Sequence, residues 1–251
     1  MGKTYRDIFN QRGNLYNQAM AQYPGARDEE FTPLLKLLQI QASDVVADIP
    51  SGGCYLKPYL PTGTLIYSVD PSEGFLADGV SNEHVINAEI DQIPLTDGSV
   101  DKVYSLSGIH HLVDKKPFFR EMYRLLKPGG LFGLSDVAKD SIVDPFLNRF
   151  VDEHNTQGHV GIFLDASTLT DLEACGFEII SSELVPYTWN FDDRKGMVHF
   201  CRLLFGLNIG SDEEIERGIE HYLGSESKNG KIAMHWELLC ILAKKPETKP
   251  L

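Results

Sequence analysis

The chain alternates between segments that favour strands and segments that favour helices, and this alternation restricts its fold more than any other feature. Four short apolar or β-branched runs predict strands, namely residues 45–48, 64–69, 100–106 and 131–135. Before the first of them, apolar side chains at Phe31, Leu34, Leu35 and Leu38 have the spacing of one helical face. Alternating strands and helices form a mainly parallel sheet with right-handed crossovers. We therefore predict an α/β, doubly wound fold that binds its ligand at the carboxyl ends of the strands.

One helix of this alternation is marked by its ends. Asp114 is expected to cap it, Pro117 suits its first turn, and Phe118, Met122 and Leu125 form its apolar stripe. Proline and glycine at residues 127–130 should end the helix, because they do not propagate it.

The pattern changes after residue 138, where longer elements and an insertion are expected. The predicted order is helical segments near 139–156 and 167–174, a strand over 177–187, a helical insertion over 194–223 and a last strand over 232–243. We expect the last two strands to pair antiparallel and to complete a seven-stranded sheet. The resulting organisation is one domain over 1–251, with an N-terminal cap region 1–28, a ligand-binding core 28–137 and a variable substrate-side region 138–230.

Composition narrows the classes of function. The formal net charge of −13 argues against nucleic-acid binding, which needs clustered Lys and Arg. No apolar run approaches the roughly 20 residues that span a bilayer, so we expect no membrane partner. The four cysteines are scattered without a zinc-like spacing, and a reducing, cytoplasmic setting is expected. Oligomeric state is left open.

The loop that follows the first strand is the strongest local signal of a ligand. Residues 45–54 read VVADIPSGGC, so a strand ends on Asp48 and runs into a turn with Gly52 and Gly53. Such a turn brings backbone amides to the carboxyl end of the strand, where a nucleotide-like ligand can lie. A dinucleotide-binding enzyme would need G-x-G-x-x-G at this point, and residues 48–54 lack it.

Four motifs in order give the chain a family resemblance. The loop at 45–54 resembles the first motif of class I S-adenosylmethionine-dependent methyltransferases, and Val69-Asp70 resembles the acidic end of their second strand. Residues 88–101, AEIDQIPLTDGSVD, and residues 125–130, LLKPGG, are similar to two further family segments. The resemblance covers about residues 28–137 and is closest to the type 11 small-molecule enzymes. It implies a Rossmann-like fold, S-adenosylmethionine as cofactor and S-adenosylhomocysteine as product.

The resemblance also implies a set of cofactor contacts. Asp70 would accept from the two ribose hydroxyls, Asp48 would face the ammonium, and Glu89 would accept from the adenine amino group. The full set of expected cofactor-binding residues is Asp48, Pro50, Ser51, Gly52, Gly53, Asp70, Pro71, Glu89, Ile90, Asp91, Ser107 and Tyr16. Pro50 and Cys54 depart from the family pattern, because proline removes an amide donor and cysteine adds a Cβ where glycine is usual.

Candidates for chemistry follow the fourth strand and the next helical segment. His110, His111 and His154 are the expected catalytic histidines, and Arg12, His110, Glu153 and His154 are the expected substrate contacts. The acidic and histidine-rich run 152–159 is interpreted first as a solvated helix end, with a polar pocket wall as the alternative. No metal is predicted, since His154 and His159 are five residues apart and do not share a helical face.

The aromatic residues near the end of the chain are expected to form the core of the insertion: Tyr187, Trp189, Phe191, His199, Phe200 and Phe205. The family resemblance implies, in addition, that Arg12, Tyr16 and Tyr23 lie on an N-terminal helix that covers the cofactor and excludes water.

We accordingly predict a methyltransferase that acts on an O, N, S or C nucleophile of a small-molecule acceptor. The alternative is a protein that binds S-adenosylmethionine without transferring methyl. A third possibility, methylation of a basic protein, is less favoured.

Overall fold

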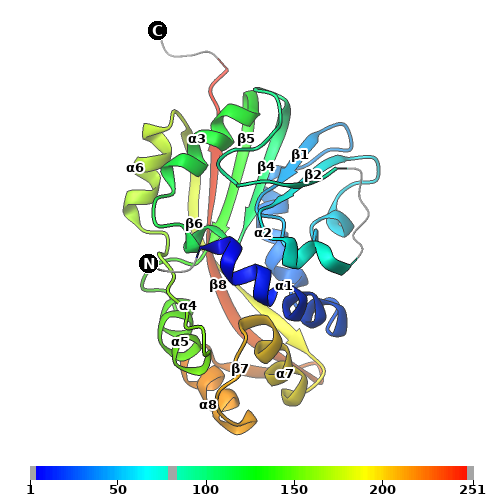
Figure 1. Cartoon of the computed structure of the whole chain (residues 1–251), viewed down its shortest axis with the longest axis vertical. Helices are drawn as coiled ribbons and strands as arrows, with labels where there is room; N and C mark the ends of the chain where they lie inside the picture. Colours follow the sequence, from blue (N-terminus) through cyan, green and yellow to red (C-terminus); the bar gives the residue numbers. More distant parts are fainter. Residues whose placement is uncertain (1–3, 79–83, 248–251) are drawn as a thin grey trace.

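A single sheet occupies the centre of the molecule, and the order of its strands is β3-β2-β1-β4-β5-β8-β6, with β7 paired to β8 (Figure 1). The computed structural model describes residues 4–78 and 84–247. Within them the strands are β1 Val45–Asp48, β2 Leu65–Asp70, β3 Val85–Asn87, β4 Val100–Leu106, β5 Leu126–Asp136, β6 Glu178–Phe191, β7 Ser225–Lys228 and β8 Lys231–Lys244. β1 to β5 pair parallel with one another, whereas β8 is antiparallel to both β5 and β6. The predicted mainly parallel α/β fold with an antiparallel C-terminal pair is confirmed.

The sheet departs from the prediction in the number of its strands. β7 is an eighth strand, and it pairs with β8 through a tight hairpin that places Lys228 opposite Lys231. It is short and carries polar side chains, so the sequence shows no apolar alternation there.

Helices cover both faces of the sheet. They are α1 Tyr5–Gln22, α2 Asp28–Leu38, α3 Lys116–Leu125, α4 Val143–Pro145, α5 Asp152–His154, α6 Ala166–Ala174, α7 Arg194–Phe205 and α8 Asp212–Tyr222. Short 3-10 turns lie at η1 Lys57–Tyr59, η2 Glu73–Asp78 and η3 Ile109–His111, and a π-helical turn, η4 Phe146–Val151, joins α4 to α5. The helix predicted near 139–156 is therefore a helical run in three parts.

An apolar core lies on each face of the parallel part of the sheet. On one face, Phe31, Leu34 and Leu38 of α2 pack against Val46 and Tyr104 of the sheet. On the other face, the apolar stripe of α3 and Leu172 of α6 pack against the opposite sides of the same strands. Side chains alternate across a strand, so a central parallel strand buries both of its faces and reads as an apolar run.

The beginning of α3 differs from the prediction. The helix starts at Lys116, one residue after its N-cap Lys115, and that cap makes no side-chain hydrogen bond. Asp114 lies one residue earlier, where its carboxylate accepts from the Lys116 amide at 2.9 Å. Asp114 thus bonds the first helical amide from outside the helix, since an aspartate commonly bonds an amide two residues on.

The C-terminal part of the sheet extends well beyond the other strands. β6 and β8 each run for 14 residues, and their far ends support α7 and α8 in the lower part of the view (Figure 1). Met197, Phe200, Cys201 and Leu204 of α7 are buried, as their helical spacing predicts. Across the described ranges, no helix combines the length and the apolar character that a membrane crossing needs.

Candidate active site

Acidic residues end three of the parallel strands at the same edge of the sheet. Asp48 ends β1, Asp70 ends β2 and Asp136 ends β5, while Ser107 follows β4 directly. All three carboxylates are buried, with 4% or less of each residue exposed. Burying a carboxylate is unfavourable unless it is hydrogen-bonded or meets a positive group, so these residues mark this edge as a candidate site.

Asp70 accepts three hydrogen bonds within the described residues. Its Oδ2 accepts from the Gly52 amide at 2.8 Å and from the Tyr5 hydroxyl at 2.9 Å, and its Oδ1 accepts from the Ser72 amide at 2.8 Å. Burial raises the pKa of Asp70 to about 6, and these hydrogen bonds oppose the rise. Tyr5 belongs to α1, so the N-terminal helix is bonded to the end of β2.

Asp48 has the opposite character. Its carboxylate forms no hydrogen bond with any residue in the described ranges, although it lines a cavity at the strand ends. Burial, and secondarily the Asp70 charge, raise the pKa of Asp48 well above its ordinary value. A buried carboxylate of this kind is suited to a cationic ligand group, because a positive charge would offset the cost of ionising it.

The loop after β1 uses most of its own amides. The Ser51 amide donates to Val69 O at 2.9 Å and the Cys54 amide donates to Ser51 O at 3.0 Å, while Gly52 donates to Asp70. Pro50 has no amide hydrogen. The amide of Gly53 is the one in this loop that donates to no described residue. The expectation that this turn presents its backbone amides to a ligand is therefore wrong for Ser51 and Gly52, whose amides donate within the protein.

The two unusual residues of the loop have distinct surroundings. Pro50 packs on Gly108, where a Cβ would lie 2.3 Å from the Pro50 ring, and the Ile49–Pro50 peptide is cis. Cys54 takes a left-handed conformation with φ of 62°, which glycine adopts more readily than any side-chain-bearing residue. The proline thus fills a space that Gly108, in the turn after β4, leaves open.

Helix α1 lies across this edge of the sheet. Arg6 forms an ion pair with Glu89 at 2.8 Å, and Phe9 stacks on Phe75 with ring centroids 5.1 Å apart. Gly13 allows the close approach, since a Cβ there would lie 2.5 Å from the Gly74 backbone. The N-terminal helix thus covers the strand ends through polar and aromatic contacts together.

Two cavities lie under α1. We call the first the strand-end cavity; it is lined by Tyr5, Phe9, Tyr16, Asp48, Pro50, Ser51, Gly52, Tyr55, Phe75 and Ser107, among others. We call the second the histidine cavity; it is lined by Arg12, Glu30, His110, His111, His159, Trp189, Phe205 and Trp236, among others. Phe9, Tyr16, Arg27 and Ser107 line both. A group bound in one cavity would therefore be adjacent to a group bound in the other.

The remaining predicted cofactor residues lie on either side of these cavities. Pro71, Glu89, Ile90 and Asp91 line a neighbouring pocket that shares Tyr5 with the strand-end cavity. Gly53 instead lines a hollow on the outer side of α1.

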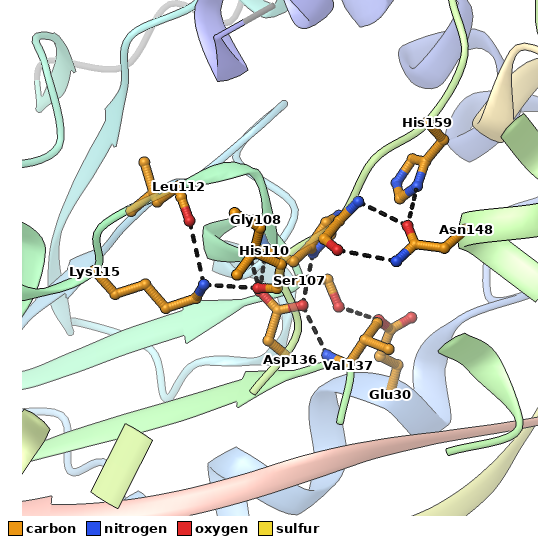
Figure 2. Close-up of polar contacts among 12 residues, drawn as sticks. Glu30, Ser107, Gly108, His110, Leu112, Lys115, Asp136, Val137, Asn148 and His159 are labelled. Carbon is orange, nitrogen blue, oxygen red and sulfur yellow. Dashed lines mark hydrogen bonds and ion pairs between the residues drawn. The ribbon is translucent and has the colours of Figure 1, made fainter. Parts of the chain in front are cut away.

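His110 lines the histidine cavity and is paired with Asp136, which is fully buried and does not line the cavity (Figure 2). The distance from His110 Nδ1 to Asp136 Oδ1 is 2.7 Å, and Asp136 also accepts from the backbone amides of Gly108, His110 and Val137. Burial by itself raises the pKa of Asp136, but His110 and these amides outweigh it and lower the pKa below its ordinary value. An ionised Asp136 accepts only, so His110 donates from Nδ1 and keeps Nε2 as an acceptor.

Two further histidines complete the cluster. His159 Nδ1 lies 3.2 Å from Asn148 Oδ1 (Figure 2). The ring centroid of His110 lies 4.2 Å from that of His111 and 5.6 Å from that of His159. Burial lowers the pKa of His159 to about 3 and that of His111 well below its ordinary value, with further lowering from His110 and Arg12. Both imidazoles are therefore neutral near pH 7.

The ligand atoms of His110, His111 and His159 lie within 4.8 Å of one another, which is close enough to share a metal ion. Arg12 and Lys115 act on the same rings as positive charges, and they would repel a cation as they repel a proton. The absence of a metal thus stays a prediction, for which this charge distribution is the physical argument.

Arginines approach the cavities from two elements. Arg27 forms a buried ion pair with Glu30 at 2.6 Å, and Glu30 also accepts from the Ser107 hydroxyl at 3.0 Å (Figure 2). Arg12 of α1 donates through Nη2 to Leu204 O at 2.7 Å and has no carboxylate partner among the described residues. The charge of Arg27 is therefore neutralised by Glu30, whereas that of Arg12 has no counter-charge among the described residues.

The residues of the run 152–159 have different surroundings in the structure. Glu153 is exposed, and His154 bonds Phe150 O at 2.8 Å and stacks on the Phe150 ring; neither residue lines the two cavities. His159, by contrast, is 8% exposed and lies beside His110 and His111. The interpretation of this run as a solvated helix end is therefore wrong for His159.

Several residues of the site were not predicted: Tyr5, Arg27, Glu30, Asp136 and His159. Asp136 carried a usable signal, since it ends a strand in the same way as Asp48 and Asp70. Trp189 and Phe205 were expected only in the core of the insertion, yet they also line the histidine cavity.

Comparison with known proteins gives concordant results. Residues 48–134 match the family described as "Methyltransferase domain". A malonyl-[acyl-carrier protein] O-methyltransferase of Marinomonas sp. is 24% identical over 221 residues, which cover 83% of this chain and 80% of that protein.

Solved structures share the fold at low identity. The [4+2]-cyclase SpnF is similar with a TM-score of 0.63 and 17% identity, covering 99% of this chain and 98% of that one. A phosphoethanolamine N-methyltransferase of Haemonchus contortus, solved with S-adenosylhomocysteine, has a TM-score of 0.61 and 16% identity, covering 97% of this chain and 60% of that one.

Proposed function

We propose that the chain, which belongs to the class I S-adenosylmethionine-dependent methyltransferases, transfers the methyl group to a small-molecule acceptor in the histidine cavity. The observation that carries the proposal is the junction of the two cavities, because Phe9, Tyr16, Arg27 and Ser107 line both. A donor group on the strand-end side would then face an acceptor on the histidine side.

The residues of the strand-end cavity fit the cofactor's chemistry. Asp48 in its lining offers an unpartnered carboxylate to the ammonium. Asp70 is not in the lining, but it accepts from Tyr5 and Gly52, which are, and we assign its carboxylate to the ribose hydroxyls. Phe9, Tyr16 and Phe75 give apolar walls, while Glu89 and Ile90 line the neighbouring pocket on the adenine side. The loop amides fit less fully, because those of Ser51 and Gly52 are bonded within the protein and Gly53 lines the hollow on the outer side of α1.

The cofactor supplies a methyl group on a sulfonium, which is already activated for displacement by a nucleophile. The protein's contribution is then to align the acceptor, to exclude water and to remove a proton where the acceptor carries one. Helix α1 covers the site, and aromatic side chains line both cavities. We assign proton removal to His110, whose Nε2 is an acceptor because Nδ1 donates to Asp136. His111 is placed beside it as a second candidate, and Arg12 as a substrate contact.

Two measurements test the proposal. Isothermal titration with S-adenosylhomocysteine should show binding, and incubation with S-adenosylmethionine and a pool of small molecules should yield S-adenosylhomocysteine by mass spectrometry. Malonyl-[acyl-carrier protein] is the first defined acceptor to try, because a relative is named for it. An absence of cofactor binding at millimolar concentration would overturn the proposal. Binding without product from any acceptor would instead favour a protein that uses the cofactor without methyl transfer.

A further inference from the structure

The charges around the histidine cavity do not balance. Glu30 neutralises Arg27 through the 2.6 Å ion pair, and Asp136 is bonded to His110. No ion pair within the described ranges includes Arg12, although this residue is buried, with only 8% of its surface exposed. A protein with a net charge of −13 therefore keeps one buried guanidinium without a counter-charge.

Three buried nitrogens of residues that line this cavity are donors without a partner among the described residues. Arg12 Nε, Trp189 Nε1 and Trp236 Nε1 are buried, and none of them bonds another described residue. Among the residues of 4–78 and 84–247, Arg12 donates only to the Leu204 carbonyl, which is neutral. Buried donors are unfavourable without acceptors, so three of them around one cavity indicate an occupant that supplies acceptor oxygens.

The walls restrict what else the occupant can carry. The indole rings of Trp189 and Trp236 stack with centroids 4.2 Å apart, and Phe205 stacks on Trp236 at 5.8 Å. These flat apolar surfaces are suited to an apolar body. A cation is disfavoured, because Arg12 already lowers the pKa of the neighbouring His111 and His159.

We infer that the methyl acceptor is a small organic carboxylate, with its carboxylate bound by Arg12 and its apolar body against Trp189 and Trp236. One guanidinium matches one negative charge, and its planar donors fit the two oxygens of a carboxylate. The inference deepens the proposed function and rests on it in one respect, since it takes the bound carboxylate to be the methyl acceptor. Carboxylate binding itself can be measured without turnover.

The two tryptophans of the chain both line this cavity, so intrinsic fluorescence reports on its occupancy. The probes are phenylacetate, 3-phenylpropionate, hexanoate and benzoate, each paired with its primary amide, titrated in the presence of S-adenosylhomocysteine. At least one acid should bind about tenfold or more tightly than its amide, as a charge-assisted hydrogen bond predicts. Arg12→Gln should abolish this preference and Arg12→Lys should retain part of it. Arg120→Gln, on the exposed side of α3, is the matched control and should leave the preference unchanged.

The outcomes separate this inference from the proposed function. If no acid is preferred over its amide, or if the preference persists in Arg12→Gln, the carboxylate site is overturned. If Arg12→Gln fails to fold, the preference for each acid over its amide can still be measured on the unmodified protein and on Arg12→Lys, and it decides whether the carboxylate site exists. Carboxylate preference without S-adenosylhomocysteine formation from any acceptor would support the site while overturning methyl transfer. If only neutral acceptors are methylated, the result would support methyl transfer and overturn the carboxylate site.

Discussion

His110 Nδ1 and Asp136 Oδ1 lie 2.7 Å apart, and this contact joins the turn after β4 to the end of β5. Asp136 is fully buried and takes three backbone amides in addition, so the carboxylate is fixed and the imidazole is oriented by it. A histidine held in this way is ready to accept a proton at Nε2. Asp136 acts through His110 and is a positioning residue.

Asp136→Asn should lower kcat by about 100-fold for an acceptor that must lose a proton, because the amide no longer fixes the His110 tautomer. Cofactor affinity, measured by titration, should be unchanged, since Asp136 does not line the strand-end cavity. The effects of Asp136→Asn and His110→Gln should not add in the double variant, as expected of residues that act together. Additive losses, or a fall in cofactor affinity, would contradict the assignment.

Tyr5→Phe should tighten the binding of S-adenosylhomocysteine several-fold. The Tyr5 hydroxyl donates to Asp70 Oδ2 at 2.9 Å, which we assign to a ribose hydroxyl, so its removal frees an acceptor that is otherwise occupied. Isothermal titration measures the change. Tyr23→Phe is the control, because Tyr23 bonds His199 instead. Weaker binding in Tyr5→Phe would mean that the hydroxyl assists the cofactor.

Cofactor affinity should fall as the pH drops through about 6. Asp70 has a pKa of about 6, so it is ionised at pH 7.5 and loses that charge to a proton at pH 5. The protonated group is a poorer acceptor for ribose hydroxyls, and the raised pKa of Asp48 changes affinity in the same direction. Titrations from pH 5 to 7.5 should show the fall, and Asp70→Asn should flatten it. A constant affinity across this range would exclude a contact with ionised Asp70.

Glu30→Ala should lower the free energy of unfolding by about 3–5 kcal/mol, because it leaves the buried Arg27 without its partner. Asp192→Ala removes the partner of Lys231 on the surface and should have little effect. Urea denaturation followed by circular dichroism compares the two. Equal stabilities for both variants would show that Arg27 finds another acceptor.

Exhaustive dialysis against a chelator should leave methyl transfer unchanged. The three histidines are close enough to bind a metal, but Arg12 and Lys115 disfavour a cation there. Activity that is lost on dialysis and restored by zinc would show that the cluster holds a metal. Elemental analysis of the purified protein gives an independent check.

Much of the fold was accessible from local patterns. Apolar runs at 45–48, 100–106 and 131–135 became neighbouring parallel strands, and the motif order predicted the cofactor correctly. The positions of Asp48 and Asp70 at strand ends followed from the same reasoning, since parallel strands bring their carboxyl ends to one edge. The family resemblance also predicted Arg12, Tyr16 and Tyr23 on a covering helix; the structure has the first two in α1 and Tyr23 as its C-cap residue.

The tertiary structure decided which of the candidate side chains meet. Tyr5 reaches Asp70 across 65 residues of chain, and His110 reaches Asp136 across 26, so no local spacing encodes either contact. His154 and His159 look alike in sequence, yet one packs on Phe150 and the other faces the histidine cavity. Arg12 and Arg27 likewise differ through packing, because Glu30 lies within reach of only the second. Short-range periodicity fixes elements and their faces, whereas the pairing of buried charges depends on how distant segments pack.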